Sequence, residues 1–533
     1  MAPTPIVGRL GQIGSMWSRD REYQMGNSDP LVIAIDTSTT STKAIIVDPN
    51  GNVLAQAKQE FPLSNPRTSF YEHDPLDWWN TTNATVGKAI SGLKKKQRKR
   101  IAAMAMTHQR ETFAPFDEDG VPLRSGIIWM DGRAADQIRR YGTPEIHALS
   151  GKPADITPAL YKLAWVKENQ PEILPEAYKV VDVHGYLVFK LTGQWVSSVA
   201  CADSLGLFDI AKQDYDPGLL EIAGVRRDQM SDLKKPGEII ADIDPSITHN
   251  WGLDHTIPLV AGMGDGQAAG IGAAAVSADT MYLNLGTAVV AGVHGPDYAY
   301  GKAYRTLAAG IPDWYDFELL VSSGAYLATW FREALGNPAL GARPDPELEA
   351  GAVALPVGSL GLITMPYWNA VQTPHWDPVA RGAVVGWRGI HKRPAMYRSI
   401  LEAIGIEMRN GLEGLEADTG TKVTQIRAMG GGTRSPLWRQ IMTDAMGVPI
   451  TACLEDEISA MGAAVAAMSV TGVHGEPDIA VYAEKMAQFG DTTEPDRDNY
   501  ELYGEVAAIQ KKLYPALQEV NEDIHSFMER HPG

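Results

Sequence analysis

The sequence predicts an α/β protein of two domains with a ligand-binding cleft between them. The chain has 533 residues, more than one hydrophobic core usually organises. A β-hairpin with a hydroxyl-rich tip is predicted over residues 31–48, and a second hairpin of the same design over 280–293. The two hairpins lie about 250 residues apart, which indicates an internal duplication with one hairpin in each domain.

The composition is that of a folded protein, and the net charge disfavours nucleic acid and membranes as partners. Hydrophobic residues make up 44% and charged residues 21%, so a disordered or collagen-like chain is excluded. A net charge of −18 repels phosphate backbones and anionic lipids, which argues against nucleic acid and membranes as partners. The cysteines, Cys201 and Cys453, are too far apart for a zinc motif. Without a secretion signal or a run of about 18 apolar residues, a cytoplasmic location is expected.

The first hairpin follows a polar N-terminal extension, residues 1–29. Its strands are predicted over 31–35 and 43–48, joined by a Ser/Thr-rich loop that begins with Asp36. Hydroxyls and free backbone N–H groups can surround phosphate oxygens, and a carboxylate at a strand end can hold Mg²⁺ through water. A Ser/Thr turn capped by Asp36 explains the same residues, so the loop alone leaves both interpretations open.

A short strand predicted over 101–106 leads to the charged pair Arg110 and Glu111, and Trp129 follows. This combination suits a polyhydroxylated ligand, because Arg donates to hydroxyls, Glu accepts from them and Trp covers the carbon chain. An ion pair at the surface is the alternative. Helices are predicted next, over 159–169 and 177–191.

Asp265 lies in a glycine-rich segment directly after the strand predicted over 256–261. With small residues on both sides, its carboxylate would be exposed at the floor of the cleft, where it could accept a proton from a substrate hydroxyl. Helix N-capping is the common alternative. Gly264-Asp-Gly-Gln-Ala-Ala also fits the dinucleotide fingerprint, but about 20 residues on the chain reads Leu283-Asn-Leu-Gly-Thr instead of offering an acidic residue, which disfavours a dehydrogenase.

In the second half, a helix predicted over 395–416 precedes a strand over 423–429 and the glycine-rich turn 430–435. Consecutive glycines let the backbone approach a ligand closely, and the helix predicted next, over 436–446, favours an anion or a ring edge at its start. A plain tight turn is equally compatible with these glycines. Residues 476–533 are acidic and helix-prone.

Taken together, these motifs resemble those of the FGGY family of carbohydrate kinases over nearly the whole chain, from about Leu31 to about Gly475. Each motif alone is weak, and their order carries the resemblance. The matching segments are Asp36-Thr-Ser-Thr-Thr-Ser-Thr-Lys, Gln109-Arg-Glu-Thr, Trp129-Met-Asp-Gly-Arg, Lys162-Leu-Ala-Trp, Ser204-Leu-Gly-Leu-Phe-Asp, Gly264-Asp, Gly286-Thr, Gly324, Gly430-Gly-Gly-Thr-Arg-Ser and Glu457-Ile-Ser-Ala-Met-Gly-Ala-Ala.

The resemblance implies two actin/hexokinase-type (ribonuclease H-like) α/β domains that close over ATP, Mg²⁺ and an open-chain sugar. Residues 30–275 would form the N-terminal domain with the sugar and phosphate site, and residues 276–475 the C-terminal domain with the nucleotide site. Residues 476–533 would be a helical tail packed on the second domain. The resemblance also suggests a homodimer, although no residue of the sequence identifies the interface.

The resemblance assigns roles to individual residues as well. Asp265 would be the catalytic base that takes the proton from the attacking hydroxyl, and Asp36 would position Mg²⁺. The implied substrate-binding residues are Gln109, Arg110, Glu111, Trp129, Asp131, Asp265 and Gly266. The implied nucleotide-binding residues are Thr39, Thr40, Ser41, Lys43, Gly286, Thr287, Gly324, Gly431, Gly432 and Ser435.

The motifs divide on substrate identity. Arg110, Glu111 and segment 365–382 look like glycerol kinases, whereas segment 430–440 is closer to xylulose kinases. Thr157 and Gly266 stand where glycerol kinases carry a tyrosine and a glutamine, which predicts room for a longer substrate. We therefore expect an ATP-dependent kinase for a terminal hydroxyl of a pentulose such as D-xylulose. The alternatives are a glycerol or erythritol kinase and a non-catalytic nucleotide-binding protein of the same fold.

Overall fold

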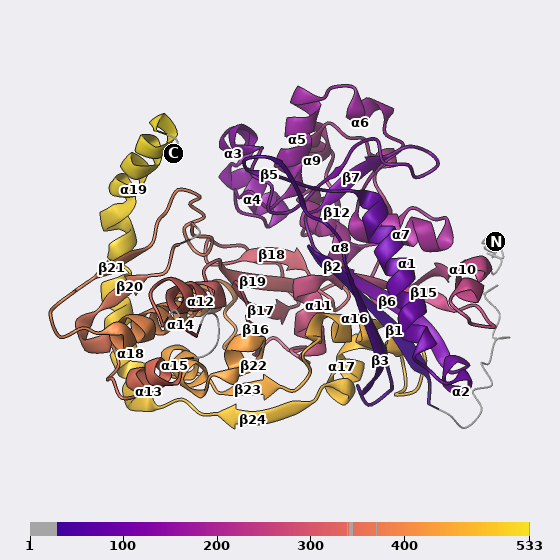
Figure 1. The fold of residues 1–533 in the computed structure, drawn as a ribbon. Helices are drawn as coiled ribbons and strands as arrows, with labels where there is room; N and C mark the ends of the chain where they lie inside the picture. The colour runs from indigo at the N-terminus through magenta and orange to yellow at the C-terminus, as the bar shows by residue number, and fades with distance from the viewer. Residues whose placement is uncertain (1–28, 338, 341–344, 369, 532–533) are drawn as a thin grey trace, which may run out of the picture.

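Two large mixed sheets organise the computed structural model, which describes residues 29–337, 339–340, 345–368 and 370–531 (Figure 1). The extension expected over 1–29 lies outside the described residues, apart from Asp29. The first sheet has the order β14 (Ile239–Asp242), β15 (Pro258–Gly264), β6 (Ile101–His108), β1 (Leu31–Thr37), β2 (Ser41–Val47) and β3 (Val53–Glu60). The second has the order β18 (Arg305–Ala308), β19 (Tyr315–Val321), β17 (Val289–Gly295), β16 (Thr280–Leu285), β22 (Gln425–Met429), β23 (Ile450–Cys453) and β24 (Phe489–Thr493).

The two sheets repeat one strand pattern. In each, a central strand, β1 or β16, pairs antiparallel with the next strand of the chain and parallel with a later strand, β6 or β22. A further parallel strand and an antiparallel edge strand complete that side of each sheet. The repetition confirms the predicted α/β fold with two domains of the same type. Residues 38–40 and 286–288 form the two hairpin tips.

Two helices from distant parts of the chain, α11 (Asp265–Gly272) and α16 (Ile458–Ser469), cross at very close range. A Cβ atom on Gly272 would lie 2.1 Å from the carbonyl oxygen of Ile458, and one on Gly462 would lie 1.9 Å from that of Ala268. Only glycine therefore fits at these two crossing points. Alanines of α16 also pack on β1, β6 and β15, so this helix of the second predicted domain lies against the first sheet. The crossing fixes the helix that begins with Asp265.

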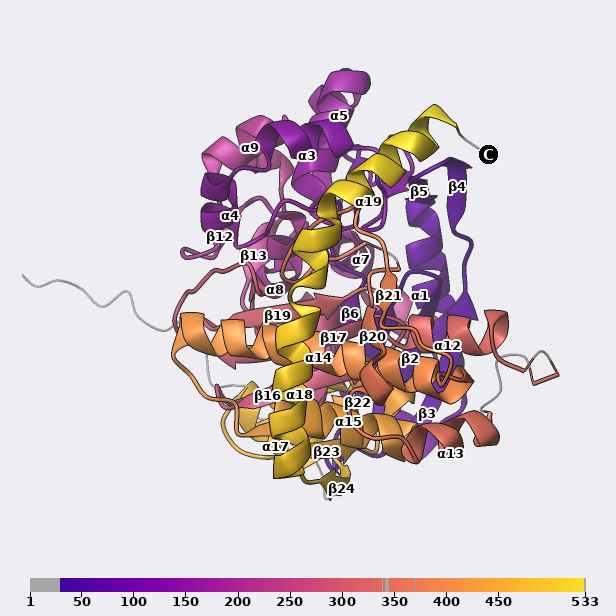
Figure 2. The ribbon, with the colours of Figure 1, turned by 90° about the vertical axis from the view of Figure 1, so that its left-hand side faces the viewer.

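A third, five-stranded sheet and the remaining helices surround this frame (Figures 1 and 2). The sheet has the order β4 (Ser64–Arg67), β5 (Phe70–His73), β8 (Gly126–Ile127), β7 (Phe113–Phe116) and β9 (Lys179–Asp182). Short strands form three pairs: β10 (Val196–Ser198) with β13 (Asp232–Lys234), β11 (Phe208–Asp209) with β12 (Asp214–Tyr215), and β20 (Ile363–Met365) with β21 (Ala383–Val385). The helices of the first half are α1 (Pro75–Ser91), α2 (Lys95–Arg98), α3 (Ala135–Tyr141), α4 (Pro144–Ser150), α5 (Ala159–Asn169), α6 (Ile173–Glu176), α7 (Val183–Thr192), α8 (Val199–Ala202), α9 (Pro217–Ala223) and α10 (Pro245–Asn250). Those of the second half are α12 (Ala325–Ala334), α13 (Pro346–Val353), α14 (Arg393–Thr419), α15 (Pro436–Met446), α17 (Ile479–Met486), α18 (Arg497–Gln510) and α19 (Leu513–Arg530).

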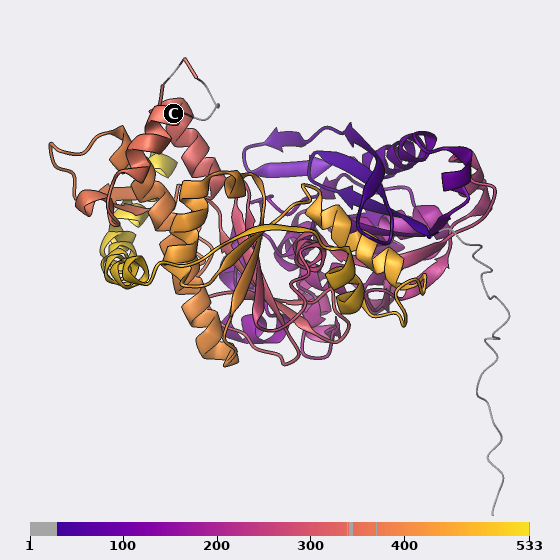
Figure 3. The same cartoon turned by 90° about the horizontal axis from the view of Figure 1, so that it is seen from below.

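Two stretches differ from the sequence-based expectation. The helix predicted over 177–191 is a strand, β9, followed by helix α7, because Asp182 caps the helix by accepting a 2.5 Å hydrogen bond from the backbone N–H of Gly185. The tail over 476–533 is not wholly helical, since β24 joins the edge of the second sheet (Figure 3). None of the helices in the described ranges is long and apolar enough to cross a bilayer.

Glu407 on α14 gives the second half a pH-dependent stability. Burial raises the pKa of this carboxyl from its ordinary value of 4.5 to about 7, although Gln510 at 2.8 Å and Tyr367 at 3.2 Å donate hydrogen bonds to it. The Glu407 carboxyl therefore ionises near pH 4.5 in the unfolded chain and near pH 7 in the folded protein. Stability is therefore lost as the pH rises between these values, by at most about 3 kcal/mol above pH 7.

We expect Glu407→Gln to stabilise the protein at pH 8 by about 1–3 kcal/mol and to have little effect at pH 5, because glutamine keeps the acceptor oxygen and cannot ionise. Urea unfolding at the two pH values measures the difference. Glu413→Gln on the same helix is the control, since Glu413 is half-exposed and pairs with Arg409. Equal effects of Glu407→Gln at both pH values would contradict the assignment.

Candidate active site

The tip of the first hairpin forms a hydroxyl-lined loop that contacts one of the predicted substrate-binding residues. Ser38 Oγ donates to the backbone carbonyl of Ser41 at 2.9 Å, which closes the turn. Thr40 at the tip is exposed and Ser41 is buried. Trp129 Nε1 donates to Thr39 Oγ1 at 2.9 Å. The predicted phosphate loop and the predicted substrate tryptophan are thus in direct contact.

Asp36 lies near the end of β1, and its Oδ1 atom is enclosed without a hydrogen-bond partner in the part of the chain that the structure describes. Burial, together with the charge of Asp265, raises the pKa of Asp36 to about 7. Asp36 on β1 and Asp265 directly after β15 lie at the same end of the first sheet, on either side of β6. An unsatisfied carboxylate oxygen beside a second carboxylate suits a cation. Among the described residues, no group of three His, Cys, Asp or Glu side chains could form a protein-only metal site. A cation here would keep water or phosphate ligands, as Mg²⁺ does.

Lys43, predicted to contact phosphates, pairs with the carboxylate of Glu457. Glu457 directly precedes α16, so the ion pair joins the first hairpin to the helix that crosses α11. Both side chains are only partly exposed, at 22% and 27%. Lys43 therefore lies at the site with a partner that a bound phosphate would have to replace.

Asp265 opens α11 and presents a half-exposed carboxylate, with 43% of the side chain accessible. Arg110 Nε donates to its Oδ1 at 2.8 Å, and the backbone N–H of Gly266 donates to the same oxygen at 2.9 Å. Oδ2 has no such partner in the interactions described. The carboxylate is thus oriented through one oxygen and can accept a proton through the other.

The glycines on both sides of Asp265 are required by Arg110. A Cβ atom on Gly264 would lie 2.5 Å from Cδ of Arg110, and one on Gly266 would lie 2.4 Å from Oε2 of Glu318 and 2.7 Å from Nη2 of Arg110. The room predicted at Gly266 for a longer substrate is therefore filled by protein. The space beside Thr157 is also occupied, since Arg305 donates to its hydroxyl at 3.4 Å.

Arg110 and Glu111 are held by two side chains of the second sheet. Arg110 pairs with Glu318 on β19 at 2.9 Å, and Glu111 pairs with Arg305 on β18. Burial opposes the charge of Arg110, but Glu318 and Asp265 outweigh it and raise the pKa of the guanidinium. Arg305 and Glu318 were missed by sequence reasoning. One feature of the sequence could have indicated them: the otherwise apolar strand β19 contains two acidic residues, Asp316 and Glu318, and a buried charge requires a partner.

The other predicted substrate residues lie around this centre with their polar groups occupied. Gln109 is buried and donates to the backbone carbonyl of Ser38 at 3.1 Å. Asp131 is buried and accepts hydrogen bonds at 2.8 Å from Arg133. Trp129 is half-exposed. In this arrangement Gln109 and Asp131 shape the site, whereas Asp265 and Trp129 have surface that a ligand could reach.

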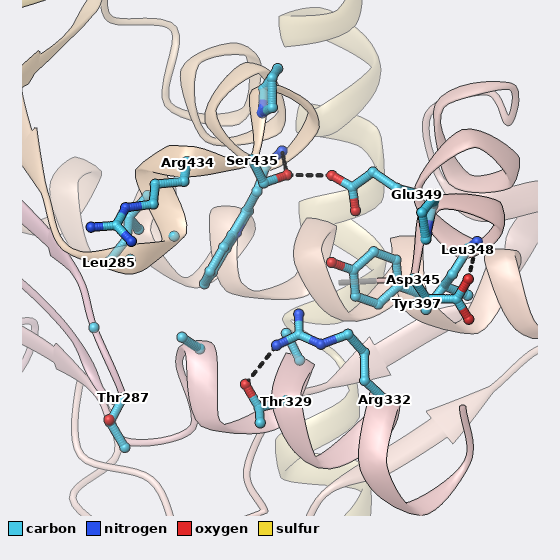
Figure 4. A pocket seen from close by; sticks show the side chains of 18 residues that line it. Leu285, Thr287, Thr329, Arg332, Asp345, Leu348, Glu349, Tyr397, Arg434 and Ser435 are labelled. Carbon is cyan, nitrogen blue, oxygen red and sulfur yellow. Dashed lines mark hydrogen bonds between the residues drawn. The ribbon is translucent and has the colours of Figure 1, made fainter. Parts of the chain in front are cut away.

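A pocket of about 710 Å³ in the second half gathers half of the predicted nucleotide residues (Figure 4). Its wall includes Gly286, Thr287, Gly431, Gly432 and Ser435, which come from the second hairpin tip and from the turn between β22 and α15. This volume is typical of a small-molecule site. The structure thus brings together two segments about 140 residues apart that were predicted separately.

Close backbone contacts build this pocket. A Cβ atom on Gly430, where φ is +88°, would lie 2.5 Å from Oδ1 of Asn284, so the turn packs directly on β16. Gly431 has open space where a Cβ atom would stand. Gly324 does not line the pocket, but a Cβ there would lie 2.5 Å from the backbone nitrogen of Val289, so it supports the second hairpin.

Helices α12, α13 and α14 supply polar and aromatic side chains that the sequence did not reveal. Ser435 Oγ donates to Glu349 at 2.5 Å, and Arg332 donates to the hydroxyl of Thr329 at 2.9 Å (Figure 4). Tyr397 lies between Glu349 and Arg332 in the same view. No local motif marks these residues, because helix packing alone places them in the wall.

Comparison with known proteins gives consistent results for sequence and fold. Models of the FGGY family of carbohydrate kinases match twice, the N-terminal domain over residues 31–272 and the C-terminal domain over 281–470. A xylulose kinase of Escherichia coli strain K12 is 27% identical over 91% of this chain and 99% of its own length. A glycerol kinase of Gloeobacter violaceus is 30% identical over 86% of this chain and 90% of its own length. A ligand-bound xylulose kinase structure from Lactobacillus acidophilus has a TM-score of 0.86 at 24% identity, covering 93% of this chain and 100% of that one.

We expect Gly431→Leu to weaken nucleotide binding at least about tenfold, because Gly431 lines the pocket and has open space where a Cβ atom would stand, so a larger side chain there would take up space needed by the nucleotide. Titration calorimetry with ATP measures the affinity, and the melting temperature should stay within about 2 °C of the parent. Gly389→Leu is the matched control, since Gly389 also has open space at its Cβ position and does not line the pocket. Unchanged ATP affinity in Gly431→Leu would place the nucleotide elsewhere.

Proposed function

Because the chain belongs to the FGGY family of carbohydrate kinases, and is therefore an ATP-dependent phosphotransferase with an alcohol group as acceptor, we propose that it phosphorylates a terminal hydroxyl of an open-chain pentulose such as D-xylulose. The sugar site is assigned mainly to residues 30–275 and the nucleotide site to residues 276–475.

The observation that carries the proposal is the half-exposed carboxylate of Asp265, held by Arg110 through one oxygen and open at the other. In this reaction Asp265 accepts the proton of the sugar's attacking hydroxyl. The hydroxyl oxygen then bonds to the γ-phosphorus of ATP as the bond to ADP breaks and ADP leaves. Arg110 keeps the carboxylate oriented. Phosphoryl transfer depends mostly on such positioning and on charge neutralisation.

Asp36 is the residue we assign to Mg²⁺, because its enclosed Oδ1 atom has no hydrogen-bond partner among the described residues. Bound Mg²⁺ would neutralise charge on the phosphates of ATP. Thr39, Thr40, Ser41 and Lys43 are assigned to the phosphates from the first hairpin, and the second hairpin tip contributes Gly286 and Thr287.

The charge balance of the site favours a neutral sugar over an acidic one. Arg110 and Arg305 are each paired with buried carboxylates, so neither offers a free positive charge to a substrate carboxylate. Lys162 is buried as well and donates to the backbone carbonyls of Ile128, Trp129 and Thr157 at 2.8–3.2 Å. Burial lowers the pKa of Lys162 to about 8. A ketose or polyol is compatible with this set, and an aldonate would bury an unpaired charge.

The choice of a pentulose within the neutral substrates rests on similarity. The xylulose kinase of Escherichia coli aligns over 99% of its length, and the xylulose kinase structure shares the whole fold. Glycerol and erythritol are the alternatives, since the glycerol kinase of Gloeobacter violaceus is slightly more identical. The pair Arg110 and Glu111 also resembles the corresponding motif of glycerol kinases.

We expect Asp265→Asn to lower kcat by at least about 10³-fold while leaving ATP affinity within about twofold, because asparagine keeps the hydrogen bond to Arg110 and cannot take the proton. A coupled ADP-release assay and calorimetry measure the two quantities. Asp216→Asn, at the N-cap of α9, is the control for loss of a carboxylate charge at the start of a helix. Retained turnover in Asp265→Asn would remove the proposed base.

A panel of D-xylulose, L-xylulose, D-ribulose, glycerol, erythritol and gluconate tests the substrate. The proposal predicts the highest kcat/KM for a pentulose, at least about tenfold above glycerol, and no turnover of gluconate. Product analysis should place the phosphate on a terminal carbon. Preferred turnover of glycerol would favour the polyol alternative, and ATP binding without turnover of any sugar would favour a non-catalytic protein.

A further inference from the structure

A continuous chain of ion pairs joins Asp265 to two side chains of the second sheet. Arg110 donates to Asp265 through Nε and pairs with Glu318 through its terminal nitrogens, at 2.9 and 3.2 Å. Glu318 also accepts from Arg305, through Nε at 2.8 Å and Nη2 at 2.6 Å. Arg305 then pairs with Glu111. Except for Asp265, these side chains are at most 7% exposed.

The two members from the second sheet occupy rigid positions. Arg305 on β18 and Glu318 on β19 are directly opposite each other in the antiparallel register, so their side chains share one face of the sheet. Strand β18 is also fastened to the first half of the chain. The backbone N–H of Thr306 donates to the carbonyl of Gly151 at 2.8 Å, and Lys152 Nζ donates to the carbonyl of Thr306 at 2.8 Å.

Glu318 is charged although it is fully buried. Burial opposes its ionisation, but Arg110 and Arg305 outweigh burial, and the pKa of Glu318 is lowered. Without this negative charge the buried guanidinium groups of Arg110 and Arg305 would lose the counter-ion that they share. Arg110 would also lose the contact that orients its Nε toward Asp265. The missing Cβ of Gly266 leaves the space in which Glu318 and Arg110 meet.

We propose that Glu318 and Arg305 are positioning residues of the sugar site: Glu318 holds Arg110 against the catalytic Asp265, and Arg305 holds Glu111, so that sugar recognition in the first domain depends on the second sheet. The inference rests on the proposed function of Asp265. It adds that residues 30–275 alone do not form a complete sugar site. The nucleotide pocket shares none of these side chains, so its affinity should not depend on them.

The test compares Glu318→Gln with Asp316→Asn in the full-length enzyme. Asp316 is two residues away on the same strand and equally buried, but it accepts a 2.9 Å hydrogen bond from Tyr282 and does not pair with Arg110. Burial and the charge of Glu318 raise the pKa of Asp316, so asparagine resembles its neutral form. The substrate is the best sugar of the panel, and kcat, sugar KM, ATP KM and melting temperature are measured.

Glu318→Gln should lower kcat/KM for the sugar at least about 30-fold and leave the ATP KM within about threefold, whereas Asp316→Asn should keep sugar kinetics within about threefold of the parent. Equal losses for sugar and ATP, equal effects of the two substitutions, or parental kinetics in Glu318→Gln would overturn the inference. If Glu318→Gln does not fold, Glu318→Asp keeps the charge on a shorter side chain. It should raise the sugar KM at least about fivefold without changing the ATP KM, and parental sugar kinetics there would overturn it.

The proposed function fails separately from this inference. Turnover that survives Asp265→Asn removes the base and the proposed function, whatever the result at Glu318. Loss of turnover in Asp265→Asn together with parental kinetics in Glu318→Gln keeps the function and removes the positioning role.

Discussion

One buried carboxylate, Glu318, connects the two halves of this kinase at the place where its chemistry is assigned. It neutralises Arg110 from the first sheet and Arg305 from its own, and each arginine then reaches a further carboxylate, Asp265 or Glu111. Two like charges so close in the interior are stable only with such counter-charges. The orientation of Asp265 thus follows from charge compensation across the boundary between the sheets.

Close packing through glycine provides the second condition. Gly264 and Gly266 let the Arg110 side chain lie against the backbone that carries Asp265, and Gly272 and Gly462 let α11 and α16 cross at backbone distance. Larger side chains at these positions would displace either the guanidinium or the helix. The glycine-rich sequence around Asp265 therefore reflects protein packing, and it does not indicate a larger space for substrate.

Much of the fold was predictable because it depends on local patterns. The hairpins at 31–48 and 280–293 and the helices over 395–416 and 436–446 follow from periodicity and turn residues. The turn 430–435 was recognised by its glycines, and it does line the pocket. Strand β24 was missed because its sequence, Phe-Gly-Asp-Thr-Thr, has no apolar alternation, and only pairing with β23 makes it a strand. Arg305 and Glu349 were missed because Glu111 and Ser435, which they contact at the two sites, are far away in the sequence. Glu318 was missed because its charge inside an apolar strand indicates a partner without identifying which residue that is.

During the reaction, Asp265 should contact the hydroxyl that attacks ATP while Glu318 holds Arg110 in place. A crystal structure with D-xylulose and a non-hydrolysable ATP analogue tests it most directly. We expect a terminal hydroxyl of the sugar within about 2.6–3.2 Å of Asp265, an adenosine group along residues 430–435, and an unbroken pair between Arg110 and Glu318. A sugar bound away from Asp265, or Arg110 turned from Glu318 toward the ligand, would contradict it.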